Sequence, residues 1–156
     1  MNRKTQYKKI DQVIDQEINK LIDNGYQQAA LGTIDINGQP FVSKVTPMLF
    51  EGSVYLLISD LSEHARNITV NANVSIYFAA AEKNKTRSNN PRLSLQGKIF
   101  KLSLDKNDSF FKNLVSRHSL IDIGSEFWSN FDDFNFYKFE ERRKLYVYGF
   151  GSAYEG

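Results

Sequence analysis

The segment Val54–Phe78 constrains the fold of this chain most strongly, because it predicts two strands joined by one short helix. Val, Ile, Leu, Tyr and Phe dominate Val54–Ser59 and Val74–Phe78, and such residues suit a pleated, partly buried surface. The run Leu61–Asn71 between them is predicted to be helical. A strand–helix–strand unit with a polar connection is therefore expected.

The connection after the first strand carries a dense group of polar side chains. Ser59 or Asp60 is predicted to cap the helix, because a side-chain oxygen there accepts from unpaired N–H groups of the first turn. A helix N-terminus also favours anions. The pattern predicts a site for a polar or anionic group, surrounded by Ser59, Asp60, Ser62, Glu63, His64, Arg66 and Asn67.

Further strands are predicted on both sides of this unit. Asn37-Gly38 joins the strands Tyr26–Ile36 and Gln39–Phe50, because this dipeptide readily adopts positive φ. A second turn is expected at Glu51-Gly52. In Pro91–Ser103, a strand with a bulge or close approach at its glycine is expected. This meander is typical of a small barrel or sandwich.

Helices are predicted at the start of the chain and again late in it. Apolar residues recur at helical spacing over 7–24, and a glycine follows as a natural stop. Asp105–His118 predicts a helix capped by Asp105, and Ile121–Asn130 predicts a second short helix. The structural interpretation of the first helix, packing on the barrel or on a second subunit, is favoured over a membrane-surface role.

The closing strands are expected at Asn135–Glu140 and Lys144–Phe150, with Glu141–Arg143 as the turn between them. The YGFGSA run near the end of the chain is interpreted as a terminal strand bent at Gly149 and Gly151, not as a dinucleotide-binding loop. One domain over 1–156 is expected, with an N-terminal helix (7–24), barrel strands (26–103, with the short helix 61–71), a helical segment (105–130) and final strands (134–150).

Composition excludes several functions. Lys plus Arg number 20 against 18 Asp plus Glu, a balance that gives no electrostatic case for nucleic acid. The absence of cysteine excludes disulfides, thiolate catalysis and Cys-ligated metals or haem. No apolar run approaches the roughly 20 residues of a membrane span. A cytoplasmic protein with no membrane partner is therefore expected.

The chain resembles the pyridoxamine 5′-phosphate oxidase-like split β-barrels, and among them the haem-utilisation (HugZ/HutZ-type) branch. The matching pieces follow the family's order: Ala30–Thr33 (ALGT), Asn37–Pro40 (NGQP), Ser43–Pro47 (SKVTP), Leu56–Ile68 (LLISDLSEHARNI), Asn73–Phe78 (NVSIYF), Arg92–Gly97 (RLSLQG), Phe131–Phe139 (FDDFNFYKF) and Tyr148–Ala153 (YGFGSA). The resemblance implies a mainly β, antiparallel, FMN-binding-type split barrel with flanking helices. It also implies a homodimer with a small-molecule cofactor in the cleft between subunits.

The same resemblance implies which residues meet the cofactor. Lys44 and Arg66 are expected to hold anionic groups, because the two cations suit a phosphate or a haem propionate. The remaining expected contacts are Ser59, His64, Asn67 and Asp133.

Whether the cofactor is haem, FMN or neither stays open. Flavin-binding relatives carry basic residues where this chain has Ser43, Met48 and the Ser62–His64 run, and that difference favours the haem branch. Haem-degrading relatives carry an axial His beyond the GFG run, whereas no His follows Gly151 here. A haem- or FMN-dependent oxidoreductase and a cofactor-free dimeric module are the alternatives, and no residue is assigned a catalytic role.

The iron ligand is equally open. Without cysteine, haem iron needs His, Tyr or Met. His64 is a candidate for that role, while His118 is interpreted as structural. Tyr146, Tyr148 and Tyr154 remain possible ligands.

An aromatic-rich stretch precedes the closing strands. Large aromatic rings bury much area and pack well on one another, so a core or subunit interface is favoured over stacking on a planar cofactor. A paired-carboxylate site at Asp132 and Asp133 is the weaker reading, because adjacent strand residues point to opposite faces. The stretch contains Phe127, Trp128, Phe131, Phe134, Phe136, Tyr137 and Phe139.

Overall fold

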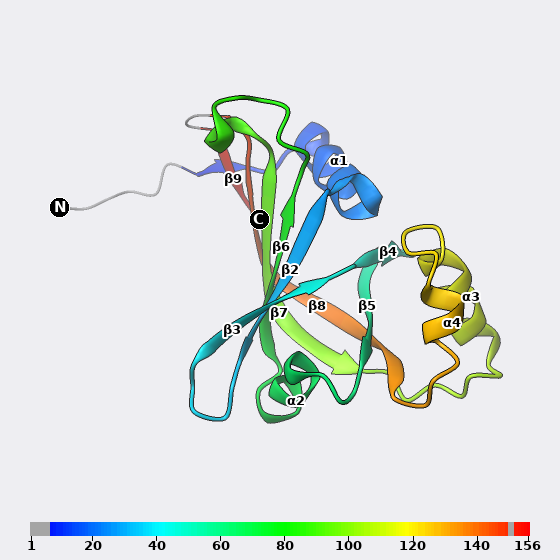
Figure 1. Ribbon diagram of the computed structural model, residues 1–156. Helices are drawn as coiled ribbons and strands as arrows, with labels where there is room; N and C mark the ends of the chain where they lie inside the picture. Colours follow the sequence, from blue (N-terminus) through cyan, green and yellow to red (C-terminus); the bar gives the residue numbers. More distant parts are fainter. Residues whose placement is uncertain (1–6, 150–151) are drawn as a thin grey trace.

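A curled, mainly antiparallel sheet with helices around it forms this molecule, as the computed structural model of residues 7–149 and 152–156 shows (Figure 1). The strands are β1 (Lys8–Lys9), β2 (Gln28–Ile34), β3 (Pro40–Val45), β4 (Met48–Phe50), β5 (Ser53–Ser59), β6 (Asn73–Ala79), β7 (Arg92–Lys101), β8 (Phe134–Val147) and β9 (Ala153–Glu155). The helices are α1 (Gln12–Lys20), α2 (Glu63–Val70), α3 (Ser109–His118) and α4 (Ser125–Trp128), with a π-turn at Leu21–Gly25 and a 3₁₀ turn at Arg87–Asn89. The expected split barrel is confirmed.

Strand β8 is the element that splits the barrel. One of its edges pairs with β7 over most of its length. The opposite edge is divided, because Phe134–Phe139 pairs with β5 and Leu145–Val147 pairs with β9. The sheet therefore continues from β8 in two directions, one toward β5 and β4 and the other toward β9 and β1.

The core has two parts that share β5 as their wall. Val54, Leu56 and Ile58 belong to the main cluster inside the barrel. Tyr55, which alternates with them, belongs to a second cluster that packs under α3. A strand buried on both faces reads as a nearly continuous apolar run, which explains the VYLLI pattern.

The predicted N-terminal helix is shorter than expected. Asp11 caps it, with a carboxylate oxygen 2.9 Å from the Ile14 amide, so α1 begins at Gln12 and not near residue 7. Lys8 and Lys9 instead pair in parallel with β9, which the sequence did not indicate. Apolar residues of α1 reach the main core, so packing on the barrel is confirmed.

Two predicted strand boundaries were wrong. The strand expected over Gln39–Phe50 is divided into β3 and β4, because Pro47 has no N–H for the ladder. The turn expected at Glu141–Arg143 is absent, since β8 runs unbroken through these charged residues. Their charged side chains give the segment a turn-like composition, but Glu141 and Arg143 remain paired with β7.

Two predicted helix caps were also wrong. Ser62, and neither Ser59 nor Asp60, caps α2. Asp108, and not Asp105, caps α3, with its carboxylate 2.7 Å from the Phe110 amide. In both cases an intervening turn delays the helix: α2 begins two residues later than predicted, and the cap of α3 lies three residues later. Part of the final glycine-containing turn, including Gly151, lies outside the described residues.

Candidate functional site

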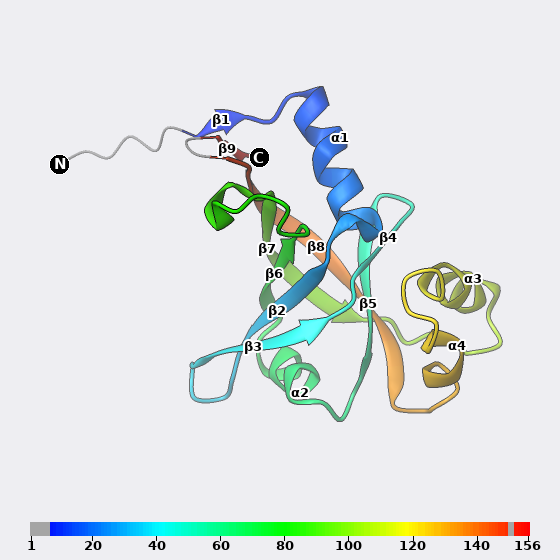
Figure 2. The same cartoon turned by 45° about the horizontal axis from the view of Figure 1, so that its top comes forward.

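A pocket of about 330 Å³ lies where β3 and β5 end, beside the start of α2 and the α3–β8 segment. Helices α2 and α4 lie on either side of β5 in both views of the ribbon (Figures 1 and 2). The pocket combines a cation, a carboxylate, two imidazoles, hydroxyls and two aromatic rings. Its lining residues are Lys44, Val45, Thr46, Leu57, Ile58, Ser59, Ser62, His64, His118, Asp122, Trp128 and Phe134.

His64 is fixed by strand β3. Its Nδ1 lies 2.7 Å from the Ser43 hydroxyl, so the imidazole is oriented by a contact between α2 and β3. Burial lowers the pKa of His64, which favours the neutral ring. The hydrogen bonds among the described residues do not engage its Nε2. This nitrogen can therefore meet a ligand in the pocket.

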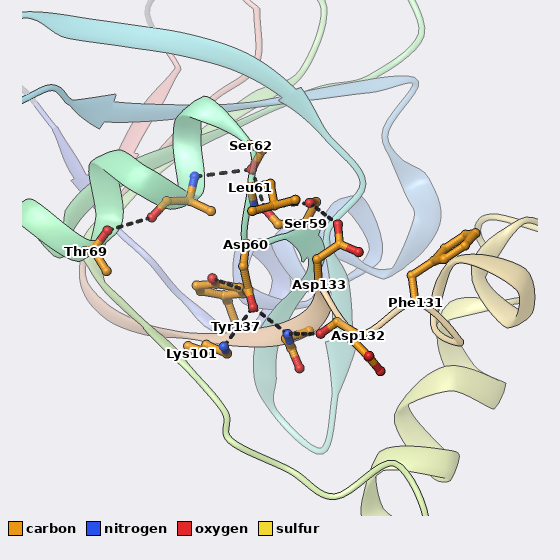
Figure 3. Close-up of polar contacts among 12 residues, drawn as sticks. Ser59, Asp60, Leu61, Ser62, Thr69, Lys101, Phe131, Asp132, Asp133 and Tyr137 are labelled. Carbon is orange, nitrogen blue, oxygen red and sulfur yellow. Dashed lines mark hydrogen bonds and ion pairs between the residues drawn. The ribbon is translucent and has the colours of Figure 1, made fainter.

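Asp133 and Ser59 are joined at the end of β5, beside the pocket, and their contact is drawn in Figure 3. The Ser59 hydroxyl donates to the Asp133 carboxylate at 2.6 Å, and the Asp60 amide donates to the Asp133 carbonyl at 2.6 Å. Both residues were predicted to meet the cofactor. The structure brings them together, with Ser59 on the pocket wall and Asp133 supporting it from the turn before β8.

A second carboxylate, Asp60, is fully engaged beside this pair. It accepts from the Tyr137 hydroxyl at 2.7 Å, the Asn135 amide at 2.7 Å and the Lys101 ammonium at 2.8 Å. Burial, followed by the hydrogen bond to Asp60, raises the pKa of Tyr137 well above its usual range. Asp60 is therefore a structural bridge between β5, β7 and β8.

The first turn of α2 sets which of its side chains reach the pocket. Ser62 accepts from the Ala65 amide at 3.4 Å and donates to the Ser59 carbonyl at 2.6 Å. This cap brings His64 into the pocket lining. Successive helical residues are about 100° apart, so Arg66 projects roughly opposite to His64. Arg66 is exposed and does not line the pocket.

Asn67 has a packing contact instead. It is 6% exposed, and its amide donates to the Thr33 hydroxyl at 3.0 Å. That buried bond ties α2 to β2. Of the six residues predicted to meet the cofactor, the pocket gathers Lys44, Ser59 and His64, whereas Arg66, Asn67 and Asp133 lie around it.

His118 forms the buried back of the pocket. A carbonyl only accepts, so the 2.9 Å contact with the Thr46 carbonyl places a proton on His118 Nε2. Its Nδ1 lies 2.5 Å from the Ser125 hydroxyl. Burial lowers the pKa of His118, partly offset by the Thr46 bond and Asp122. The structural interpretation of this histidine agrees with these contacts.

Sequence reasoning missed several wall residues. Thr46, Asp122, Trp128 and Phe134 come from segments distant in the chain, and only the barrel closure brings them to His64. For Trp128 and Phe134, the available sequence signal was the aromatic-rich stretch, which was interpreted mainly as core or subunit interface. Trp128 is instead 41% exposed.

A larger hollow, about 420 Å³, lies on another part of the sheet. None of the six predicted site residues lines it, and Arg142 is its one charged wall residue among those described. Within residues 7–149 and 152–156, no group of three or more His, Asp or Glu side chains is arranged to hold a metal ion. Over the same residues, no helix is long and apolar enough to cross a membrane.

Known proteins share this architecture. The haem oxygenase HutZ of Vibrio cholerae is 26% identical over 131 residues, which is 80% of this chain and 71% of HutZ. A haem-binding protein from Mycobacterium smegmatis superposes with a TM-score of 0.76 at 22% identity. That match covers 88% of this chain and 55% of the other, so this chain spans about half of its length.

A further solved structure matches nearly the whole of both chains. A Clostridium acetobutylicum protein related to general stress protein 26, of the pyridoxinephosphate oxidase family, superposes with a TM-score of 0.66 at 19% identity. It covers 94% of this chain and 96% of the other. The family model described as CREG, beta-barrel matches residues 25–155. The chain therefore belongs to the CREG beta-barrel family, with the split-barrel architecture of the pyridoxamine phosphate oxidase-like proteins.

Proposed function

We propose that this protein binds haem in the pocket between α2 and α4. The observation that carries the proposal is that one pocket holds Lys44, aromatic wall residues and His64, whose pKa is lowered by burial. An ammonium suits a propionate, a neutral imidazole suits haem iron, and flat apolar rings suit a porphyrin face. The similarity to HutZ, a haem oxygenase, and to the haem-binding protein of Mycobacterium smegmatis supports this choice of ligand.

Each residue has a stated part in the proposed site. Lys44 meets a propionate, whereas Arg66, on the opposite side of α2 from His64, lies outside the pocket lining and is a second cation only as the family resemblance implies. His64 presents Nε2 while Ser43 fixes its ring. Ser59 and Asp133 hold the β5 end in place, and Asn67 anchors α2 to the barrel. Bound haem would supply the iron chemistry, and these residues would position and shield the haem.

A second copy of the chain is part of this proposal. The pocket volume of about 330 Å³ lies near the lower end of the range for small-molecule sites, roughly 300–1,000 Å³. A porphyrin held there would extend beyond the pocket of a single chain. A homodimer that covers the projecting edge would bury it, as the family resemblance implies.

FMN is the second candidate. The hydroxyls of Ser59 and Ser62 line the pocket beside Lys44, and together they can bind a phosphate. The Clostridium acetobutylicum neighbour of the pyridoxinephosphate oxidase family supports this alternative. With either cofactor, the protein is an oxidoreductase only if the bound cofactor takes part in repeated rounds of reaction.

Titration of the purified protein with hemin and with FMN tests the proposal. We expect a Soret band that saturates near one haem per chain, with Lys44→Ala and His64→Ala each weakening hemin binding. The exposed Lys83→Ala, in the loop before β7, is the matched control. Arg66→Ala measured beside Lys44→Ala tests the second cation. Saturable FMN binding without a specific haem spectrum would select the flavin alternative, and binding of neither would leave the cofactor-free module.

A further inference from the structure

We infer that Trp128 is a ligand-contacting residue, whose indole forms the apolar wall against the flat ring of the bound cofactor. The inference rests on the proposed function and extends it to a residue outside the predicted site. Trp128 is the only tryptophan of the chain and lines the pocket together with Phe134. It is 41% exposed, although a tryptophan side chain gains much from burial.

Gly124 makes room for this indole. A Cβ on Gly124 would lie 2.3 Å from Trp128 Nε1 and 3.1 Å from both Cδ1 and Cε2. The backbone of Gly124 has φ −75° and ψ −10°, which any residue adopts, so its conformation does not require glycine. The absence of a side chain at Gly124 therefore leaves the space that the Trp128 ring occupies.

Phe134 fixes the indole from the start of β8. The two rings are nearly parallel, with an interplanar angle of 23° and centroids 6.0 Å apart. The backbone also supports the arrangement, since the Trp128 amide donates to the Gly124 carbonyl at 2.9 Å. A large ring held in one orientation at a pocket wall is preorganised, which lowers the entropy lost on binding a planar ligand.

The neighbouring aromatic residues supply a control. Phe127 and Phe131 are 61% and 42% exposed on the same segment, yet neither lines the pocket. If exposure of apolar surface alone mattered, Phe127 would affect ligand binding as much as Trp128. Of Phe127, Trp128 and Phe131, only Trp128 lines the pocket.

Hemin titration of four variants tests the inference, with folding checked by circular dichroism. Trp128→Leu should weaken hemin binding about tenfold, in line with the energy of aromatic contacts beyond burial. Trp128→Phe, which keeps a flat ring, should stay within about threefold of the wild type. Phe127→Leu should match the wild type. Equal effects of Trp128→Leu and Phe127→Leu, or no effect of either, would overturn the inference.

Gly124→Ala provides an independent arm, because it displaces the indole without removing it. It should shift the emission of the single tryptophan and weaken hemin binding in the wild type. It should add no further loss in the Trp128→Leu background, since coupled residues are not additive. Full additivity of the two changes would contradict the inference. A wild type that shows no saturable hemin spectrum would overturn the proposed function itself, which separates the two failures.

Discussion

At the residue scale, Asp60 shows how a polar residue in a binding motif can serve the fold. Its carboxylate joins three strands through Tyr137, Asn135 and Lys101. Tyr137 and Asn135 are buried, so removing their common acceptor leaves the Tyr137 hydroxyl unpaired and the Asn135 amide with only the Asp132 carbonyl. The Ser59–Leu61 (SDL) run, which resembles a cofactor-binding motif, therefore also stabilises the fold.

Asp60→Ala should lower the free energy of unfolding by about 2 kcal/mol or more, because unpaired buried donors cost about that much. Urea unfolding followed by circular dichroism measures the change. Asp132→Ala is the control, since that side chain is exposed and should change stability by less than about 0.5 kcal/mol. Equal effects of the two substitutions would argue against the bridging role.

His118 makes stability depend on pH. Its pKa lies below the unfolded value of 6.5, mainly through burial, so the unfolded chain binds the proton more readily. Stability from this group is present above about pH 6.5 and is lost as the pH falls through that value toward the lower folded pKa. His118→Gln keeps a donor for Thr46 and removes the titration.

Thermal unfolding between about pH 7.5 and pH 5.5 tests this dependence. The loss of stability on acidification should be smaller in His118→Gln than in the wild type. His64→Gln should remove a further part, because burial lowers the pKa of His64 as well. An unchanged acid response in His118→Gln would contradict the assignment.

At the element scale, Gly97 allows β7 and β8 to remain paired. The register shifts between Gln96 and Gly97, with Arg142 as the extra residue of β8. A Cβ on Gly97 would lie 2.0 Å from the Glu140 carbonyl oxygen, which is backbone and has little freedom to move. The predicted bulge at this glycine is confirmed, and close approach of the partner strand explains it.

Gly97→Ala should therefore destabilise the protein by more than about 2 kcal/mol, since backbone must shift to admit the methyl group. Gly32→Ala is the matched control in β2. There the nearest atoms to an added Cβ lie at 3.7 Å, an ordinary contact, so a change within about 1 kcal/mol is expected. Urea midpoints of the two variants compare them directly, and equal midpoints would refute the close-approach explanation.

The same elements show how far sequence reasoning reaches. The β5–α2–β6 unit was predictable because its strands are apolar and its helix is polar, so local pattern and final burial agree. The continuous β8 was not, because its charged middle resembles a turn and only pairing with β7 keeps it extended. The pocket wall was missed for a related reason, since Trp128 and His64 are 64 positions apart and meet only when β8 pairs with β5.

At the scale of the whole molecule, the pocket and the proposed second copy are thermodynamically linked. A ligand that is buried between two chains binds the dimer better than the single chain, so it must also promote dimer formation. The open edge of the pocket and the exposed side chains of Phe127 and Phe131 near it give a second copy apolar surface to cover.

Size-exclusion chromatography with light scattering over a dilution series tests this linkage. We expect a mass of twice that of the chain at high concentration, a shift toward the single chain on dilution, and a return to the dimer when hemin is added. Hemin affinity should fall over the same dilution range, because the free energy of hemin binding is coupled to that of dimer formation. Addition of FMN, or of buffer alone, provides the comparison. A chain that stays monomeric at every concentration while saturating with hemin would show that one copy completes the site.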